Sequence, residues 1–223
     1  MLLSCFLTSL SFFSYAQLSY AEAEEGTLYV KVNTGVGRVP EASSTKQEED
    51  GDFGAGQKLK PEKLLFYGIG AGYYLTDNVR GEIVLNNYLR SNYKSNRINT
   101  TNNISDKLTI DASSALLNCL IDFYEMDSVK LFTGAGLGIA NISGKYTQSL
   151  KGTIVLDQQK FKAKYGFAYA LYMGVIVNVT SNVDIDLSYS FRDLGKLNKA
   201  KEIFKKDVNF RGHYASLGFN FNL

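Results

Sequence analysis

The sequence contains few of the residues that metal centres, disulfide scaffolds and most catalytic sites require. Its 223 residues include two cysteines, two prolines, one histidine and no tryptophan. No cluster of His, Cys and Asp has the spacing of metal ligands, so no metal site or cofactor is expected. The net charge is only +2 and the positive residues form no single basic tract, which argues against nucleic acid as a partner. Glycine (20), tyrosine (15) and phenylalanine (14) are plentiful instead, so turn formers and strand formers dominate.

The N-terminal segment and the cysteines indicate an exported protein without disulfides. No charged residue occurs in Leu2–Tyr20, and Ser19–Ala21 supplies the small residues that signal peptidase requires. We therefore predict a signal peptide over residues 1–21 that is cleaved, with the neighbouring alanines as alternative cleavage positions. Cleavage would remove Cys5 and leave only Cys119, which cannot form a bridge within the chain. Cys119 lies in an alternating apolar stretch, so we expect it to be a small buried or lipid-facing side chain.

Two glycine-rich stretches have the spacing of a β-strand. "FYGIGAGYY" begins at Phe66 and "FTGAGLGIA" begins at Phe132, and in both the glycines follow a G-x-G-x-G pattern. A dinucleotide-binding loop needs G-x-G-x-x-G at a turn from a strand to a helix, and no helical pattern follows either stretch. At a spacing of two residues, all the glycines of a strand lie on the same face. The two stretches therefore predict strands with one smooth face.

Apolar residues alternate along most of the remaining chain, which predicts eight strands and no helix. The strands are expected at Thr27–Val39, Leu64–Thr76, Val79–Arg90, Lys107–Tyr124, Val129–Ile142, Ala163–Thr180, Val183–Asp193 and Val208–Leu223. The connections alternate in length, with long ones at 40–63, 91–106, 143–162 and 194–207. This asymmetry is typical of bacterial outer-membrane barrels. We predict an all-β fold over residues 22–223: an eight-stranded antiparallel up-and-down transmembrane β-barrel with four long external loops and three short periplasmic turns.

Alternation alone would also fit a soluble lipocalin-like barrel, whose apolar faces point inward. Three features favour the inverted arrangement of a membrane barrel, in which the apolar faces meet lipid. The polar faces carry little charge and are rich in Gly, Ala, Ser and Asn, the chain has an export signal, and an apolar stripe runs to the C-terminus at Ala215, Leu217, Phe219, Phe221 and Leu223. In this arrangement the glycine faces line the lumen and leave room for large interior side chains such as Phe66, Phe132 and Tyr172.

Seven charged residues fall on the predicted inward faces. They are Lys31, Arg80, Glu82, Asp122, Lys130, Asp184 and Asp186. Because unpaired buried charges are costly, we expect them to form an ion-pair network that plugs the lumen. Eight strands leave an interior that side chains can fill, so a wide channel is not expected. A structural or narrow-pore barrel without a specific ligand is therefore one interpretation of the function.

The sequence resembles the small outer-membrane β-barrels of the opacity-protein and OmpX-like type. The resemblance rests on the export signal, the eight-strand meander, "FTGAGLGIA", "LSYSFRDLG" and the terminal strand of alternating aromatics, and it covers about Gly26 to Leu223. Within this group the sequence is most similar to surface antigens and adhesins of rickettsia-like intracellular Gram-negative bacteria. The resemblance implies outer-membrane lipid, lipopolysaccharide and the outer-membrane assembly machinery as partners. The family commonly ends in Phe, whereas this chain ends in Leu223 with Phe221 two residues earlier.

The resemblance implies an adhesin or surface antigen that acts through its external loops. The loop at 194–207 carries five lysines and only two acidic residues, whereas the loop at 40–63 is net acidic. The basic loop is a candidate site for a host cell-surface protein, an anionic glycan or lipopolysaccharide phosphates, although a merely solvated loop would look the same. The candidate binding residues are Lys196, Lys199, Lys201, Lys205 and Lys206.

A lipid-modifying barrel enzyme is a further interpretation, because some outer-membrane barrels act on lipid A. Such chemistry needs a nucleophile and a base held together. His213 and Ser216 are three residues apart, which places them on opposite faces of a strand. We therefore predict no catalytic site, and we expect His213 to be an interfacial residue near the external end of the last strand.

Overall fold

The computed structural model describes residues 25–38, 42–43, 58–61, 63–98, 103–150, 154–196 and 209–223. The predicted signal segment at 1–21 and four of the five candidate lysines, Lys199, Lys201, Lys205 and Lys206, lie outside these ranges. Within the ranges, no helix has the length and apolar character needed to cross a membrane.

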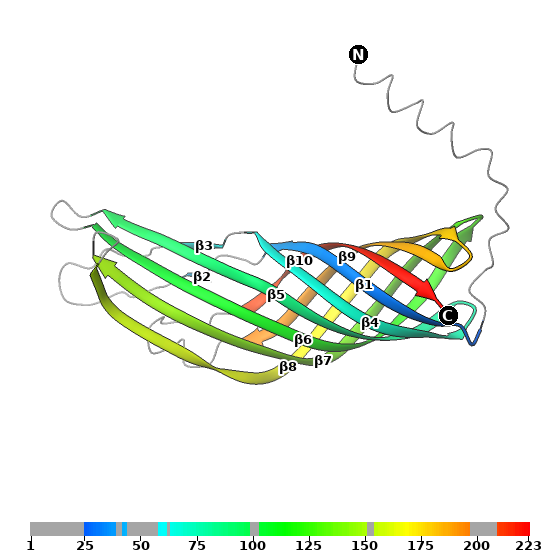
Figure 1. Cartoon of the computed structure of the whole chain (residues 1–223), viewed down its shortest axis with the longest axis horizontal. Helices are drawn as coiled ribbons and strands as arrows, with labels where there is room; N and C mark the ends of the chain where they lie inside the picture. The colour runs from blue at the N-terminus through cyan, green and yellow to red at the C-terminus, as the bar shows by residue number, and fades with distance from the viewer. Residues whose placement is uncertain are drawn as a thin grey trace, which may run out of the picture.

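In the described part of the chain, ten strands form a single antiparallel sheet. They are β1 (Leu28–Arg38), β2 (Ala42–Ser43), β3 (Lys58–Pro61), β4 (Leu64–Thr76), β5 (Val79–Ile98), β6 (Asn103–Met126), β7 (Val129–Leu150), β8 (Ile154–Thr180), β9 (Val183–Lys196) and β10 (Asn209–Asn222). Eight of them close into a barrel, because β1 pairs with both β4 and β10 and each of the others pairs with its neighbours in the chain (Figure 1). The short strands β2 and β3 extend the sheet beside the external part of β5. The predicted eight-stranded up-and-down barrel is confirmed.

Three two-residue turns join the strands at the end of the barrel where the C-terminus lies (Figure 1). They are at 77–78, 127–128 and 181–182. In the first turn, the hydroxyl of Thr76 accepts a hydrogen bond from the backbone N–H of Val79 at 3.0 Å. In the second, Asp127 has a φ of 51°, a left-handed conformation that Asp adopts more readily than most residues. Short polar residues therefore allow the chain to reverse tightly at this end.

The two faces of the wall have the polarity of a membrane barrel. In β9, Leu187 and Tyr189 on the outer face are about half exposed (50% and 46%), whereas Asp184 and Asp186 on the inner face are 4% and 1% exposed. The same alternation occurs on the other barrel strands, and the predicted C-terminal apolar stripe lies on the outer face. The apolar faces thus point outward, as membrane lipid requires.

Two glycines outside the predicted rows, on β1 and β8, make room for large rings in the lumen, and within those rows the ring of Tyr29 lies over Gly72. The ring of Phe66 lies over Gly35, where an added Cβ would come within 2.6 Å of the Phe66 Cε1 atom. The ring of Phe132 lies over Gly174 in the same way, with 2.6 Å between an added Cβ and Cζ. Such distances are shorter than any ordinary van der Waals contact, so these positions tolerate only glycine without rearrangement.

One half of the wall is much taller than the other. Strands β5 to β8 contain 20, 24, 22 and 27 residues, whereas β1, β4, β9 and β10 contain 11 to 14. The strands extend into both segments that were predicted to be loops, 91–106 and 143–162. Only residues 99–102 and 151–153 separate the strands there, so both connections are shorter than predicted. The reason is a β-bulge near each point where the apolar alternation stops. Beyond the bulges the strands continue without the alternation that lipid imposes.

Candidate functional site

The predicted basic loop cannot be placed on this structure. Lys196 is the last residue of β9, but its side chain is not described, and the other four lysines lie outside the described residues. Their grouping into one binding patch therefore stays a prediction. The described residues instead define two regions, the filled lumen and the outer face of the wall.

The middle of the lumen holds a buried ion-pair cluster around Lys31. The Nζ atom of Lys31 lies 2.6 Å from Asp186 Oδ2 and 3.2 Å from Glu82 Oε1. Tyr29 donates a hydrogen bond from its hydroxyl to the same Glu82 oxygen at 2.6 Å. All four side chains are buried, so the lysine is neutralised by two carboxylates within a low-dielectric interior.

A second charged layer lies nearer the periplasmic turns. Arg80 is fully buried, with one guanidinium nitrogen 3.5 Å from Asp122 Oδ1. The guanidinium carbon lies 4.6 Å from the centroid of Phe132, which is a cation–π distance. Lys130 pairs with Glu125 at 2.8 Å. Asp184 accepts a hydrogen bond from the side-chain amide of Asn222. All seven predicted inward charges are buried, and five of them, Lys31, Arg80, Glu82, Asp122 and Asp186, form ion pairs with one another. Lys130 pairs instead with Glu125, and Asp184 forms no ion pair among the described residues, so the predicted network is found in part.

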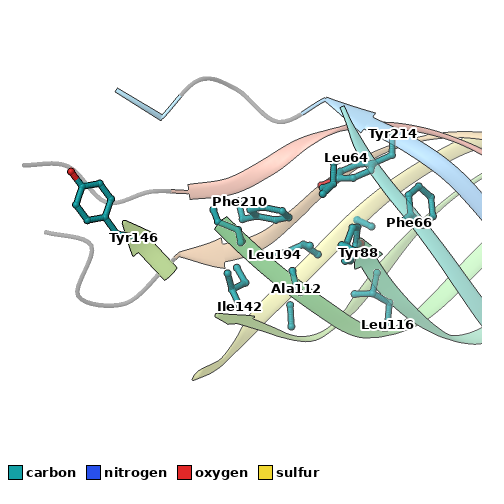
Figure 2. Packing of buried hydrophobic residues seen from close by; sticks show 14 residues of the cluster. Leu64, Phe66, Tyr88, Ala112, Leu116, Ile142, Tyr146, Leu194, Phe210 and Tyr214 are labelled. Atoms are coloured by element: carbon teal, nitrogen blue, oxygen red, sulfur yellow. The ribbon is translucent and has the colours of Figure 1, made fainter. Parts of the chain in front are cut away.

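Above these layers the lumen is aromatic and apolar. The guanidinium carbon of Arg192 lies 4.4 Å from the centroid of Phe66 and 5.0 Å from that of Tyr214. Its nitrogens donate hydrogen bonds to Ser190 and Tyr88 at 2.9 and 3.2 Å. Toward the external end the interior is an apolar cluster (Figure 2), made of Leu64, Phe66, Tyr88, Ile110, Ala112, Leu116, Ala140, Ile142, Tyr146, Ala168, Ala170, Leu194, Phe210 and Tyr214.

The space left between the polar and aromatic layers is small. A void of about 20 Å³ lies between Lys31, Asp186 and Arg192, among other side chains. That volume holds about one water molecule. The described lumen is therefore a packed core in this region.

The outer face of the tall wall carries three lysines that our sequence reading missed. Lys107, Lys145 and Lys160 are exposed on β6, β7 and β8. Lys145 is the direct cross-strand partner of Lys160, and Lys107 is paired with Thr147 two residues farther along β7. The sequence pattern predicts a loop at 143–162, which includes Lys145 and Lys160. The alternation in "KFKAKY", which begins at Lys160, is the sequence signal that could have placed that segment on a strand.

The single histidine lies where it was predicted. His213 is exposed on the outer face, with its Nδ1 atom hydrogen-bonded to the hydroxyl of Tyr189 at 2.6 Å and its ring stacked on the same tyrosine. The side chain of Ser216 lies on the opposite face of the wall, where its hydroxyl oxygen is 2.7 Å from that of Ser188. The two residues are on opposite faces and cannot act together. Among the described residues, no group of three or more His, Cys, Asp or Glu could hold a metal ion.

Cys119 is a free thiol on the outer face of β6. It lies between Leu117 and Ile121, which are also exposed there. Of the two environments predicted for it, the structure selects the lipid-facing one.

An apolar outer band, aromatic residues near its external edge, a lumen filled by charged and apolar side chains, and short turns at one end define a transmembrane β-barrel of the bacterial outer membrane. The sequence profile of the family "Outer membrane protein beta-barrel domain" matches residues 5–221. The chain belongs to this family, and its location is the bacterial outer membrane.

Several proteins of Rickettsia are similar to the chain. A Rickettsia conorii protein named "Putative adhesin RC1281" is 31% identical over 166 residues, which cover 70% of this chain and 66% of that protein, just under two thirds of its length. A Rickettsia massiliae protein named "Putative adhesin" is 25% identical over 219 residues, covering 93% of both chains. Among solved structures, the outer-membrane protein OprG of Pseudomonas aeruginosa has a TM-score of 0.54 at 12% identity, covering 92% of this chain and 99% of that one. This last likeness concerns the fold alone.

Proposed function

We propose that the protein is a surface adhesin that binds anionic host molecules at the external end of its barrel. The observation that carries this proposal is the tall wall formed by β5 to β8. A tilted strand crosses the bilayer with about 9–11 residues. The 20 to 27 residues of these strands therefore extend well beyond the membrane on the external side.

The extended wall supports a role outside the membrane. Strands that only anchored the barrel would end near the bilayer surface, as the 11 to 14 residues of β1, β4, β9 and β10 allow. An ordered sheet outside the membrane gives a rigid base for the connections between the strands, and ligands are commonly bound by loops on a rigid scaffold. The names of the rickettsial relatives agree with this role.

The charge of the loop at 194–207 supports an anionic ligand. Its five lysines outnumber its two acidic residues, so it should attract sulfated or acidic glycans and acidic protein surfaces. Exposed charges are screened by salt, and the Debye length falls to about 8 Å at physiological ionic strength. Binding that depends on these lysines should therefore weaken as salt is added.

The test is binding to an immobilised sulfated glycan and to host cells at low and at physiological salt. The test variant has Lys196, Lys199, Lys201, Lys205 and Lys206 all changed to Gln. The matched control changes the four lysines of the acidic loop, Lys46, Lys58, Lys60 and Lys63, to Gln. We expect the test variant to lose binding several-fold at low salt and the control to retain it. Equal binding by the test variant and the wild type would remove the basic loop from the mechanism.

A second candidate function is a structural barrel without a specific ligand. The buried cluster around Lys31 favours it, because a packed lumen joined by ion pairs stabilises the wall and leaves no wide channel. On this account, deleting the gene would make the outer membrane more sensitive to detergent. The variant with the five basic-loop lysines changed to Gln would restore detergent resistance as well as the wild type does. If the protein is instead an adhesin, deleting its gene should leave the detergent resistance unchanged.

A further inference from the structure

A groove crosses the outer face of the tall wall at the external edge of the lipid-facing band. Five residues on successive strands, from β4 to β8, form one row of direct cross-strand partners along it. They are Tyr67, Asn87, Ser113, Asn141 and Tyr165. Neighbouring strands are about 4.8 Å apart, so the row spans roughly 19 Å of the wall. The groove has a volume of about 480 Å³, which is within the range of sites for small ligands.

The shape of the groove follows from the sizes of these side chains. Tyr67 and Tyr165 are large and stand at its two ends, whereas the three residues between them are small and polar. On the side toward the membrane centre, the groove is lined by Ile69, Leu85, Ala115 and Ile139. The groove therefore has a polar upper part and an apolar lower part.

The row lies at the boundary between lipid and water. Below it the outer face of β6 and β7 is apolar, with Leu117 and Leu137 exposed. Above it the next outward residues are Asp111 and Ser143. Tyrosines are enriched at this level of membrane proteins because their rings are apolar and their hydroxyls are polar. A molecule in the groove would thus have one end in hydrocarbon and the other among polar groups.

The side chain of Asn141, on the outward row of the groove, has a polar atom without a partner. Asn141 Oδ1 is buried and accepts no hydrogen bond from the described residues. An unsatisfied buried carbonyl is unfavourable, and more so beside lipid, where water is scarce. A ligand with a hydroxyl or an amide N–H at this level would supply the missing donor.

The three exposed lysines lie above the groove on the same strands. Lys145 is two outward positions above Asn141 on β7, on the order of 13 Å farther along the strand. Its direct partner is Lys160, and like charges that face each other across two strands are destabilising. Among the described residues neither they nor Lys107 form an ion pair. A bound anion would relieve this repulsion.

We propose that this groove binds a phosphorylated glycolipid of the outer leaflet, namely lipopolysaccharide. An acyl chain occupies the apolar part between Ile69, Ala115 and Ile139. A hydroxyl or amide N–H of the acylated sugar donates to Asn141 Oδ1, and the phosphate lies between Lys145 and Lys160. The occupant is chosen by place and charge, because the groove opens to the lipid of the outer leaflet and two facing lysines, Lys145 and Lys160, lie above it beyond Asp111 and Ser143. This site does not depend on the adhesin function.

The test measures binding of fluorescent bisphosphorylated lipid A to the whole protein folded in an uncharged detergent. Ala115→Phe fills the groove, and Ala215→Phe, at an outward alanine on β10 away from the groove, is its matched control. Asn141→Leu removes the unpaired acceptor without filling the groove. Lys145→Gln with Lys160→Gln removes the facing charges. Heat-modifiable migration on gels verifies that each variant is folded.

We expect Ala115→Phe to weaken lipid A binding at least tenfold and Ala215→Phe to leave it unchanged. Asn141→Leu should weaken it by a smaller factor. The double lysine variant should bind bisphosphorylated and dephosphorylated lipid A equally, whereas the wild type should prefer the phosphorylated form.

Three results would overturn the proposal. In the first, folded Ala115→Phe binds lipid A as the wild type does. In the second, the wild type binds phosphatidylglycerol as tightly as lipid A, which would mean that the groove holds any anionic lipid. In the third, Ala115→Phe abolishes a dimer while lipid A binding persists, which would make the groove a contact between two copies of the chain.

Discussion

Replacing Asp186 with Asn should destabilise the folded barrel strongly, because it removes one of two carboxylates that neutralise a buried lysine. Asp186 Oδ2 lies 2.6 Å from Lys31 Nζ, and the carboxylate is almost inaccessible to solvent. Asparagine has nearly the same shape but no charge. The change therefore tests the charge of Asp186 with little effect on packing.

The structure sets the size of this effect. Removing one partner of a buried ion pair typically costs about 3–5 kcal/mol. Lys31 would keep Glu82 at 3.2 Å, so we expect the lower end of this range, about 3 kcal/mol. Asp184→Asn is the internal comparison. Among the described residues Asp184 forms no ion pair and accepts a hydrogen bond from Asn222, which an Asn side chain could still accept. This substitution should lower the free energy of unfolding by about 1 kcal/mol or less.

The assay is urea unfolding of the barrel in lipid vesicles, followed by the heat-modifiable shift on gels. A loss of about 3 kcal/mol changes the unfolding equilibrium constant by about two orders of magnitude. Lys31→Met combined with Glu82→Gln and Asp186→Asn should recover most of the lost stability, because an uncharged cluster leaves no charge buried alone. Equal unfolding of Asp186→Asn, Asp184→Asn and the wild type would refute the idea that the network stabilises the fold.

Three further predictions use the same folded protein. Gly174→Ala should lower the stability by about 1–3 kcal/mol because its Cβ would meet the Phe132 ring, whereas Gly166→Ala, with no atom within 4 Å of the new Cβ, should melt like the wild type. Arg192→Lys should lower the melting temperature, because an ammonium group has no planar surface to stack on the ring of Phe66. An unchanged melting temperature would contradict a stabilising role of this stacking. In a Cys5→Ser background, Cys119 in membranes should react with an apolar maleimide but not with a charged, impermeant one, and labelling by the charged reagent would place it in water instead.

The membrane-spanning half of the fold could be read from the sequence because lipid imposes alternation on it. The predicted strand Leu64–Thr76 has the same bounds in the structure, and Val183 begins a strand as expected. Every second side chain there must be apolar, since it faces hydrocarbon, while its neighbours face a filled lumen. The period of two is therefore present wherever the wall crosses the membrane.

The external half could not be read in this way. Strands were predicted to end at Arg90 and Ile142, and in the structure β-bulges lie at Tyr88/Ser91 and at Ile142/Gly144. A bulge inserts an extra residue and shifts the alternation by one position. Outside the membrane both faces can also be polar, so the signal is lost although backbone pairing continues. Lys145 was missed for this reason, whereas the segment that begins at Lys160 keeps an alternation that the strand prediction did not use.

The inward charges were predictable, but their partners were not. Lys31 contacts Glu82, which is 51 residues away, and Asp186, which is 155 residues away. Alternation indicates which face each residue occupies, but only the register between strands indicates the height at which it lies. The row of residues that forms the groove depends on four such registers and was equally hidden.

The pairing of β1 with β10 has a consequence for the order of events during membrane insertion. Tyr29 to Arg38 pair with Asn222 to His213, and the backbone N–H of Leu223 donates to the carbonyl of Leu28 at 2.9 Å. The cylinder is therefore sealed by segments that emerge from the ribosome and the translocon at opposite times. Until β10 has paired with it, β1 has an unpaired edge that can form hydrogen bonds with a strand of another chain. A chain that stops before Asn209 would carry this open edge permanently, and a free peptide spanning 209–223 would be a competitor for it during assembly.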